Sequence, residues 1–129
     1  MGFLDNIFRQ QNADIFPEWK ILQTEDQLDA LIQDSHAKPV VLFKHSIYCG
    51  ISARIMHQLE KDWNFNNEEL DFYYLDLITF RPISNKIASV TGVVHQSPQV
   101  ILLQEGQVRY HTSHHMISVT GLREALERA

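Results

Sequence analysis

The chain alternates short apolar segments with segments whose apolar residues recur at helical spacing, and this alternation most restricts the possible folds. Residues 39–43, Pro-Val-Val-Leu-Phe, are apolar throughout and rich in β-branched side chains. Such a run predicts a strand that is covered on both faces, as in a parallel sheet. From Cys49 onward, apolar residues recur every three or four positions instead. This change of period predicts an amphipathic helix that begins at Cys49.

The same alternation continues on both sides of these two elements. Residues 19–22 predict a short strand, and Thr24 with Gln27 three positions later has the form of a capping box that begins a helix. Residues 70–78 predict a second buried strand. A helix over about residues 82–92 follows, with proline in its first turn and glycine at its end.

The last part of the chain predicts a hairpin and a final helix. Residues 100–103 and 108–112 read as strands, Glu105-Gly106 offers the turn between them, and Ser118 is a candidate cap for the helix. The predicted order is therefore β-α-β-α-β-α-β-β-α. This order predicts an α/β fold of the thioredoxin type, with a central mixed sheet flanked by helices.

Length and composition predict one domain. A chain of 129 residues with 44% hydrophobic content is long enough to bury a core of its own. We expect this domain to cover residues 18–129. Residues 1–17 mix apolar and amide side chains, which predicts a flexible, loosely attached arm with one short helical turn around Leu4 to Phe8.

Targeting signals and charge limit the expected location and partners. No apolar run approaches the roughly 20 residues that cross a bilayer, and the first residues lack the basic start of a signal peptide. A single cysteine excludes an intrachain disulfide, so we expect a cytoplasmic protein. The net charge of -5, without a cluster of Lys and Arg, disfavours nucleic acid and anionic membranes as partners.

Cys49 is the candidate nucleophile. A thiol attacks only as thiolate, and lowering a cysteine pKa by two units takes about 2.7 kcal/mol, more than the roughly 0.3–1 kcal/mol of a helix macrodipole. Hydrogen bonds must supply the rest, and the candidates are the N–H groups of Ile51 and Ser52 and the Ser52 hydroxyl. Lys44 and His45 would add positive charge if they face the thiol. The alternative is a buried, unreactive cysteine.

Ser97-Pro98 is the second candidate element of the site. In a thioredoxin-type fold, a proline that opens this strand usually follows a cis peptide bond, which is uncommon elsewhere. Ser97 would then present its backbone to an extended substrate, as an added strand would. The alternative is an ordinary trans proline at the start of a strand.

Four short motifs occur in a fixed order: Lys44-His45-Ser46-x-x-Cys49-x-Ile51-Ser52, Arg81-x-x-Ser84-Asn85-x-Ile87-Ala88, His95-x-Ser97-Pro98-Gln99 and His114-x-x-Ile117-Ser118. Together they resemble the YtxJ family of thioredoxin-like proteins, also called monothiol bacilliredoxins. The resemblance covers about residues 18–128. One position departs from it, because many members carry proline where this chain has Gly50. Glycine restores an N–H donor there at a cost in backbone entropy.

The resemblance implies a single redox cysteine, matching Cys49, that removes the small thiol bacillithiol from S-thiolated proteins. It implies no bound cofactor, with bacillithiol as co-substrate and S-thiolated client proteins as partners. It also implies that Arg81, His95, Gln99 and His114 line the site. With no second cysteine in the chain, a further small thiol or a partner redoxin must release the thiol from Cys49.

Three other functions remain open at this point. Cys49-Gly50-Ile51-Ser52 is similar to the C-G-F-S motif of monothiol glutaredoxins, which bind a [2Fe-2S] cluster with glutathione. This chain lacks the paired glycines that those proteins use after the hairpin. A second alternative is an adaptor of the same fold that binds partners without redox turnover, since a fold does not establish chemistry.

The third alternative is a metal site formed by His111, His114 and His115. On an extended strand, His111 and His115 would lie about 13 Å apart at roughly 3.3 Å per residue, too far to share one ion. We therefore expect no metal site.

Overall fold

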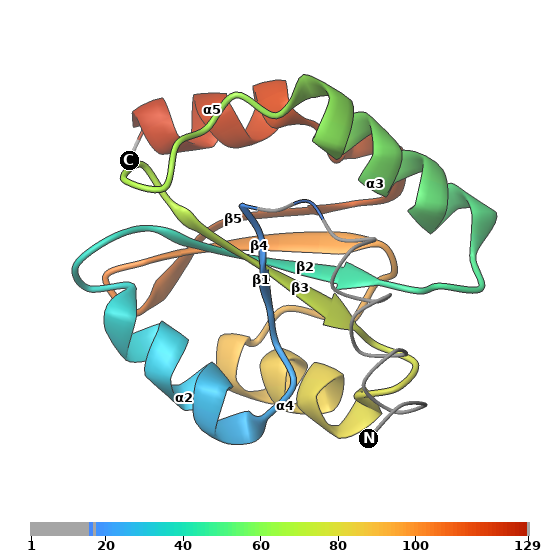
Figure 1. The fold of residues 1–129 in the computed structure, drawn as a ribbon. Coiled ribbons are helices and arrows are strands. Elements are labelled where there is room, and N and C mark those ends of the chain that lie inside the picture. The colour runs from blue at the N-terminus through green and yellow to red at the C-terminus, as the bar shows by residue number, and fades with distance from the viewer. Residues whose placement is uncertain (1–15, 17, 129) are drawn as a thin grey trace, which may run out of the picture.

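A five-stranded mixed sheet lies between two layers of helices (Figure 1). This computed structural model describes residue 16 and residues 18–128. The arm predicted for residues 1–17, with its turn from Leu4 to Phe8, lies outside the described residues except for Phe16 and is not tested. The strand order is β1-β3-β2-β4-β5. Strand β3 runs parallel to β1 and β2, whereas β4 runs antiparallel to β2 and β5.

The elements follow the predicted order. The strands are β1 (Lys20–Ile21), β2 (Val40–His45), β3 (Asp71–Asp76), β4 (Gln99–Gln104) and β5 (Gln107–Ser113). The helices are α2 (Glu25–Asp34), α3 (Gly50–Asp62), α4 (Arg81–Thr91), the 3-10 helix η1 (His114–Met116) and α5 (Val119–Arg128). Helices α3 and α5 cover one face of the sheet, and α2 and α4 cover the other (Figure 1). The α/β prediction is confirmed, with η1 as an addition before the last helix.

Local capping signals in the sequence hold in the structure. The Thr24 hydroxyl accepts a hydrogen bond from the Gln27 N–H at 3.1 Å, and the Gln27 side-chain oxygen accepts one from the Thr24 N–H at 3.0 Å. Gly92 ends α4 in a left-handed conformation at φ 73°. The Ser118 hydroxyl accepts a hydrogen bond from the Gly121 N–H at 2.9 Å and so caps α5.

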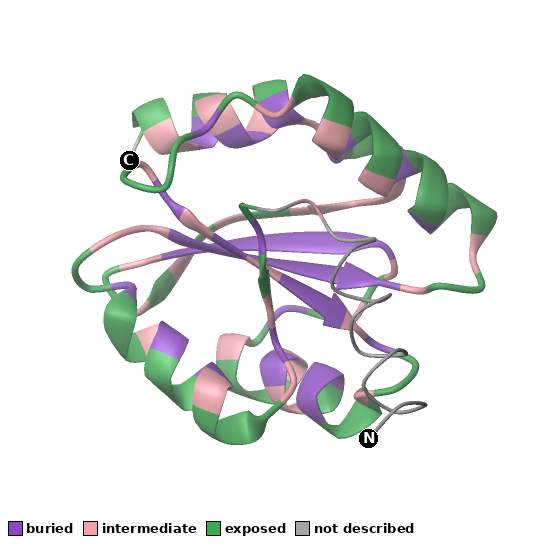
Figure 2. Cartoon of the chain, in the orientation of Figure 1, coloured by how far each residue is buried: buried purple, intermediate pink, exposed green. Residues whose placement is uncertain are grey.

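The central strand β2 is buried along its whole length (Figure 2). Phe43 faces the core beneath α3 and α5, whereas Leu42 faces the core beneath α2 and α4. Burial on both faces confirms the prediction from the apolar run. Strand β3 differs from its prediction, because Asp71 and Tyr73 are only half-buried. The reason is its place near the sheet edge, where only the two-residue strand β1 lies outside it.

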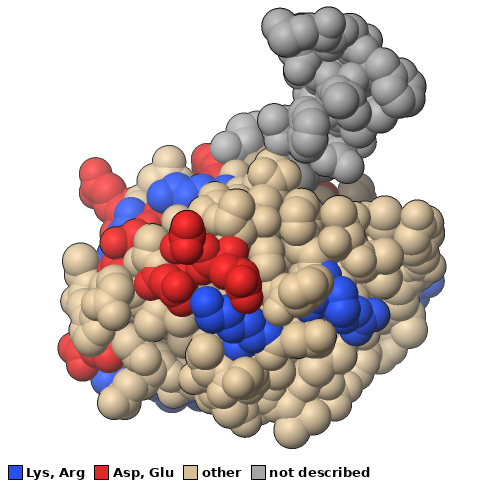
Figure 3. Space-filling model, turned by 90° about the horizontal axis from the view of Figure 1, so that it is seen from below, with Lys and Arg blue, Asp and Glu red and all other residues tan. Residues whose placement is uncertain are grey.

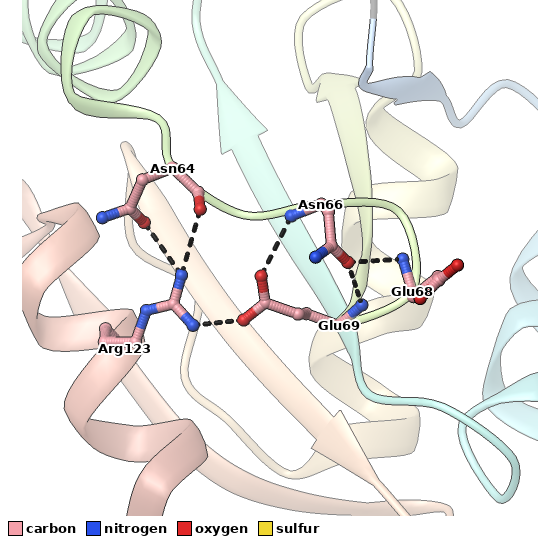
Figure 4. Close-up of polar contacts among 5 residues, drawn as sticks. All are labelled: Asn64, Asn66, Glu68, Glu69 and Arg123. Carbon is pink, nitrogen blue, oxygen red and sulfur yellow. Dashed lines mark hydrogen bonds and ion pairs between the residues drawn. The ribbon is translucent and has the colours of Figure 1, made fainter.

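A polar network fastens α5 to the loop that leads into β3 (Figure 4). The Arg123 guanidinium forms an ion pair with Glu69 and donates hydrogen bonds to the backbone and side-chain oxygens of Asn64, at 3.1 and 3.0 Å. The same guanidinium lies 4.2 Å from the ring centre of Phe65. The hydrogen bond from Arg123 lowers the pKa of Glu69. The ionised Glu69 carboxylate and the Arg123 guanidinium thus join α5 to this loop.

Charged side chains of both signs share the face formed by α2 and α4 (Figure 3). Lys86 of α4 lies 3.0 Å from the Asp29 carboxylate of α2, and this contact raises the pKa of Lys86. This ion pair joins the two helices at the surface, where an exposed pair contributes little to stability.

The β4–β5 hairpin is anchored to the end of α2 by one buried serine. Its turn residues Glu105 and Gly106 are both left-handed, at φ 55° and 75°, as a two-residue hairpin requires. The Glu105 N–H donates to the Ser35 carbonyl at 2.8 Å, and the Gly106 N–H donates to the Ser35 hydroxyl at 2.9 Å. Ser35 therefore joins segments that are 71 positions apart.

We expect Ser35→Ala to lower the free energy of unfolding by about 1 kcal/mol, because the Gly106 N–H loses its partner. Chemical denaturation in urea measures this change. Ser89→Ala, at an exposed position of α4, is the matched control and should stay within about 0.5 kcal/mol of the wild type. Equal midpoints for Ser35→Ala and the wild type would contradict this anchoring role.

Candidate functional site

Cys49 caps the N-terminus of α3, directly after the turn that leaves β2. Its backbone is extended, at φ -106° and ψ 119°, and its carbonyl accepts the first helical hydrogen bond, from the Ala53 N–H at 3.0 Å. The Cys49 N–H donates to the Ser46 carbonyl at 3.2 Å and closes the turn. The residue is half-buried. The predicted position at a helix start is confirmed, and the thiol stands where the first free N–H groups of the helix gather.

Ser52 and His45 form a hydrogen bond with each other rather than with the Cys49 thiol. Ser52 is fully buried, and its hydroxyl oxygen accepts a hydrogen bond from the Ser46 N–H at 3.1 Å. The same oxygen lies 2.7 Å from Nδ1 of His45. Burial lowers the pKa of His45 to about 4, against an opposing effect of Asp76. His45 is therefore neutral at neutral pH, and its Nδ1 shares a hydrogen bond with the Ser52 hydroxyl.

This pairing changes two expectations about the thiolate. His45 supplies no positive charge at neutral pH, because its burial keeps the imidazole uncharged. The Ser52 hydroxyl is committed to His45 and Ser46, and no side-chain cap hydrogen bond joins the Cys49 sulfur to the first turn of α3. The backbone N–H groups of Ile51 and Ser52 remain the predicted donors to a thiolate.

Gly50 is the first residue of α3, but the backbone at this position does not require glycine. A Cβ built on it meets no atom within 4 Å, and its backbone is not left-handed. The extended conformation of Cys49 also suits a residue that precedes proline. The site geometry would therefore accept the proline that many YtxJ-like sequences carry here.

The Ser97–Pro98 peptide bond is cis, as predicted. The Pro98 carbonyl accepts a hydrogen bond from the N–H of His114, the first residue of η1. Helix η1 in turn packs against α3. The proline segment and η1 therefore lie at the same edge of the molecule as the N-terminal end of α3. His114 is half-buried and has a left-handed backbone at φ 54°.

Four other predicted site residues gather on the opposite face of the sheet. Lys44 is fully buried, and its Nζ lies 3.2 Å from the Ser84 carbonyl of α4 and 3.2 Å from Nδ1 of His95. Gln99, which pairs with Lys44 across β2 and β4, donates from its side-chain amide to the Val94 carbonyl at 3.0 Å.

The charges of this second group repel one another. Burial, followed by the charge of Arg81, lowers the pKa of Lys44 to about 8. Burial and then the charge of Lys44 lower the pKa of His95. Arg81 itself is exposed at the start of α4. No ion pair among residues 18–128 involves Lys44.

The structure thus divides the predicted site residues between two faces. Lys44 and His45 are neighbours in β2, and successive side chains of a strand point to opposite faces. Lys44 and His45 therefore cannot both face Cys49. The contact of Lys44 with Ser84 was not predicted from the sequence. The one feature of the sequence that points to Ser84 is the Arg81-x-x-Ser84 motif, and this motif does not specify a contact with Lys44.

The histidines near the C-terminal end of β5 are divided between two elements. His111 belongs to β5, whereas His114 and His115 belong to η1. Across the described part of the chain, no group of three or more His, Cys, Asp or Glu side chains is placed to hold a metal ion. Among residues 18–128, no helix is long and apolar enough to span a membrane.

We predict that Lys44 makes the free energy of unfolding rise with pH in the alkaline range. In the unfolded chain this lysine keeps its proton up to the ordinary pKa of 10.5, whereas in the folded protein it loses the proton near 8. Between these values the unfolded state binds more protons, so stability rises with pH. The gain should be on the order of 3 kcal/mol relative to Lys44→Met, which lacks the titrating group.

Urea unfolding at about pH 7.5 and about pH 10 measures this difference. Lys86→Met, at a half-buried lysine of α4, is the control for losing a lysine outside the core. A constant stability difference between Lys44→Met and the wild type across this range would contradict the buried, weakly basic lysine.

Comparisons with known proteins agree with this geometry. The family model described as monothiol bacilliredoxin BrxC matches residues 20–122. A solved structure described as a candidate oxidoreductase with a thioredoxin fold is 32% identical, with a TM-score of 0.73, over 84% of this chain and 94% of that one.

A thioredoxin of Fasciola hepatica is 21% identical, with a TM-score of 0.67, over 84% of this chain and 97% of its own. A thioredoxin of Trypanosoma brucei brucei is 19% identical, with a TM-score of 0.66, over 89% and 93% of the two chains. These two structures show the shared thioredoxin fold. The fold and the family match support a thiol–disulfide redox function, and because the family model covers most of its length, this chain belongs to the monothiol bacilliredoxin BrxC family.

Proposed function

We propose that this protein removes a small thiol, bacillithiol, from S-thiolated cytoplasmic proteins by thiol–disulfide exchange at Cys49. The observation that carries this proposal is the placement of the single cysteine of the chain. It stands half-buried at the start of α3, near the cis-proline segment, and no second cysteine exists to form an internal disulfide. Such a thiol is suited to exchange with a mixed disulfide rather than to making a disulfide within one client.

The exchange conserves the disulfide and moves it to a new pair of sulfurs. The Cys49 thiolate attacks the sulfur of the small thiol, a new bond forms between these two sulfurs, and the client cysteine leaves as a thiolate that takes a proton from water. Cys49 then carries the small thiol. A second small thiol attacks this adduct, releases Cys49 and leaves as a symmetrical small-molecule disulfide.

Ser52 supports this one-cysteine chemistry. It occupies the position three residues after Cys49, where a dithiol protein would carry its second cysteine. Serine has no sulfur with which to attack the adduct, and its buried hydroxyl, bonded to His45 and Ser46, holds the turn before Cys49 in place instead. The adduct therefore has to wait for an external thiol.

The surroundings of the thiol suit a protein client. Ile47, Tyr48 and Ile51 expose 48%, 81% and 43% of their surfaces next to Cys49 in the sequence. Exposed apolar side chains grouped around a reactive atom are typical of surfaces that contact other proteins. A client that presents its mixed disulfide to Cys49 would cover them.

We expect the reduced protein to form a covalent adduct on Cys49 when it is exposed to oxidised bacillithiol. Intact-protein mass spectrometry measures the adduct, with oxidised glutathione and coenzyme A disulfide in parallel to identify the preferred thiol. Cys49→Ser should form none. A wild-type protein that stays unmodified by all three disulfides would contradict exchange and favour a non-catalytic adaptor. A purified protein that absorbs visible light would favour a cluster carrier instead.

A further inference from the structure

Lys44 is a buried cation whose position none of the exchange steps explains. Its side chain is fully buried, and no carboxylate of the described residues pairs with it. Burying a charged group without an opposite charge destabilises a protein, and an apolar residue of similar size is often more stable at such a position. A stabilising role therefore does not account for Lys44.

The contacts of Lys44 lead to the segment before the cis proline. Its Nζ lies 3.2 Å from the Ser84 carbonyl of α4 and 3.2 Å from Nδ1 of His95. The ammonium thus fixes the imidazole of His95 between the end of β2 and the first turns of α4. His95 stands two residues before Ser97 in the segment that enters β4.

A second buried side chain holds the same segment. Gln99 is directly opposite Lys44 in the β2–β4 pairing, and its amide donates to the Val94 carbonyl at 3.0 Å. Farther along, the Pro98 carbonyl is occupied by the His114 N–H. Residues 94–98 are therefore held at three points, while Ser97 makes no backbone hydrogen bond within residues 18–128. This leaves the Ser97 backbone free to pair with a client segment.

We infer that Lys44 is a positioning residue that acts through His95 to hold the Ser97 backbone in place for an extended client segment. The inference rests on the proposed function and assigns Lys44 a role that differs from stabilising the thiolate. Lys44 points to the α4 face of the sheet, whereas the Ser52–His45 pair beside Cys49 lies on the α3 face. Lys44 is thus separated from the first turn of α3 by the sheet itself.

The two roles predict different results for Lys44→Met. If Lys44 positions Ser97, the variant should release the small thiol from an S-thiolated peptide on the order of tenfold more slowly, mainly through weaker peptide binding. Alkylation of Cys49 by iodoacetamide and exchange with a small symmetrical disulfide should stay within about twofold of the wild type, because neither reaction needs the Ser97 backbone. If Lys44 stabilises the thiolate, all three reactions should slow together.

Partner and control variants sharpen the test. His95→Ala should reproduce the defect, and the double variant should be no worse than either single variant, since both remove the same contact. Lys86→Met, on the helix that carries Ser84 but outside this cluster, should behave as the wild type. Amide hydrogen exchange gives a readout that is independent of activity, and Lys44→Met should lower protection at the His114 N–H, which donates to the Pro98 carbonyl of this segment.

Each outcome bears on one claim. Normal peptide turnover and unchanged amide protection in Lys44→Met would overturn the positioning role. A parallel loss of alkylation and peptide turnover would overturn it in favour of thiolate stabilisation. A wild-type protein that transfers no small thiol from any peptide would contradict the proposed function itself, and the hydrogen-exchange comparison would still decide whether Lys44 holds the segment.

Discussion

The position of the thiol depends on β2, the strand that is buried on both faces at the centre of the sheet. It pairs in parallel with β3 and antiparallel with β4, so its carboxyl end is fixed from both sides. The strand ends in Lys44 and His45, whose side chains point to opposite faces. Four residues later the chain enters α3 at Cys49. Cys49 is therefore placed by the strand that is buried throughout and paired on both sides.

Two polar pairs extend this placement into the loops around the site. On the α3 face, His45 and Ser52 close the turn that carries Cys49. On the α4 face, Lys44 and His95 reach the segment before Pro98. Buried polar groups are costly when one partner is lost, so each pair favours a single arrangement of its loop. The nucleophile and the proposed client-binding backbone are thus both fixed relative to one strand.

The sequence predicted those parts of the molecule that local signals determine. The capping box at Thr24, the glycine that ends α4 and the apolar run of β2 are each specified within a few neighbouring residues, and all three were found. The half-buried β3 was misjudged because its exposure depends on the short strand beside it. The contact between Lys44 and His95 joins residues 51 positions apart and depends on the path of a loop, which a single sequence does not specify.

The direction of thiol transfer tests the central claim most directly. Reduced protein is mixed in equal amounts with a peptide that carries one bacillithiol-modified cysteine, and intact mass spectrometry follows a single turnover. The account predicts that the bacillithiol mass appears on Cys49 while the peptide is released with a free cysteine. A covalent complex of Cys49 with the peptide, accompanied by free bacillithiol, would contradict it, because the thiolate would then have attacked the client sulfur instead.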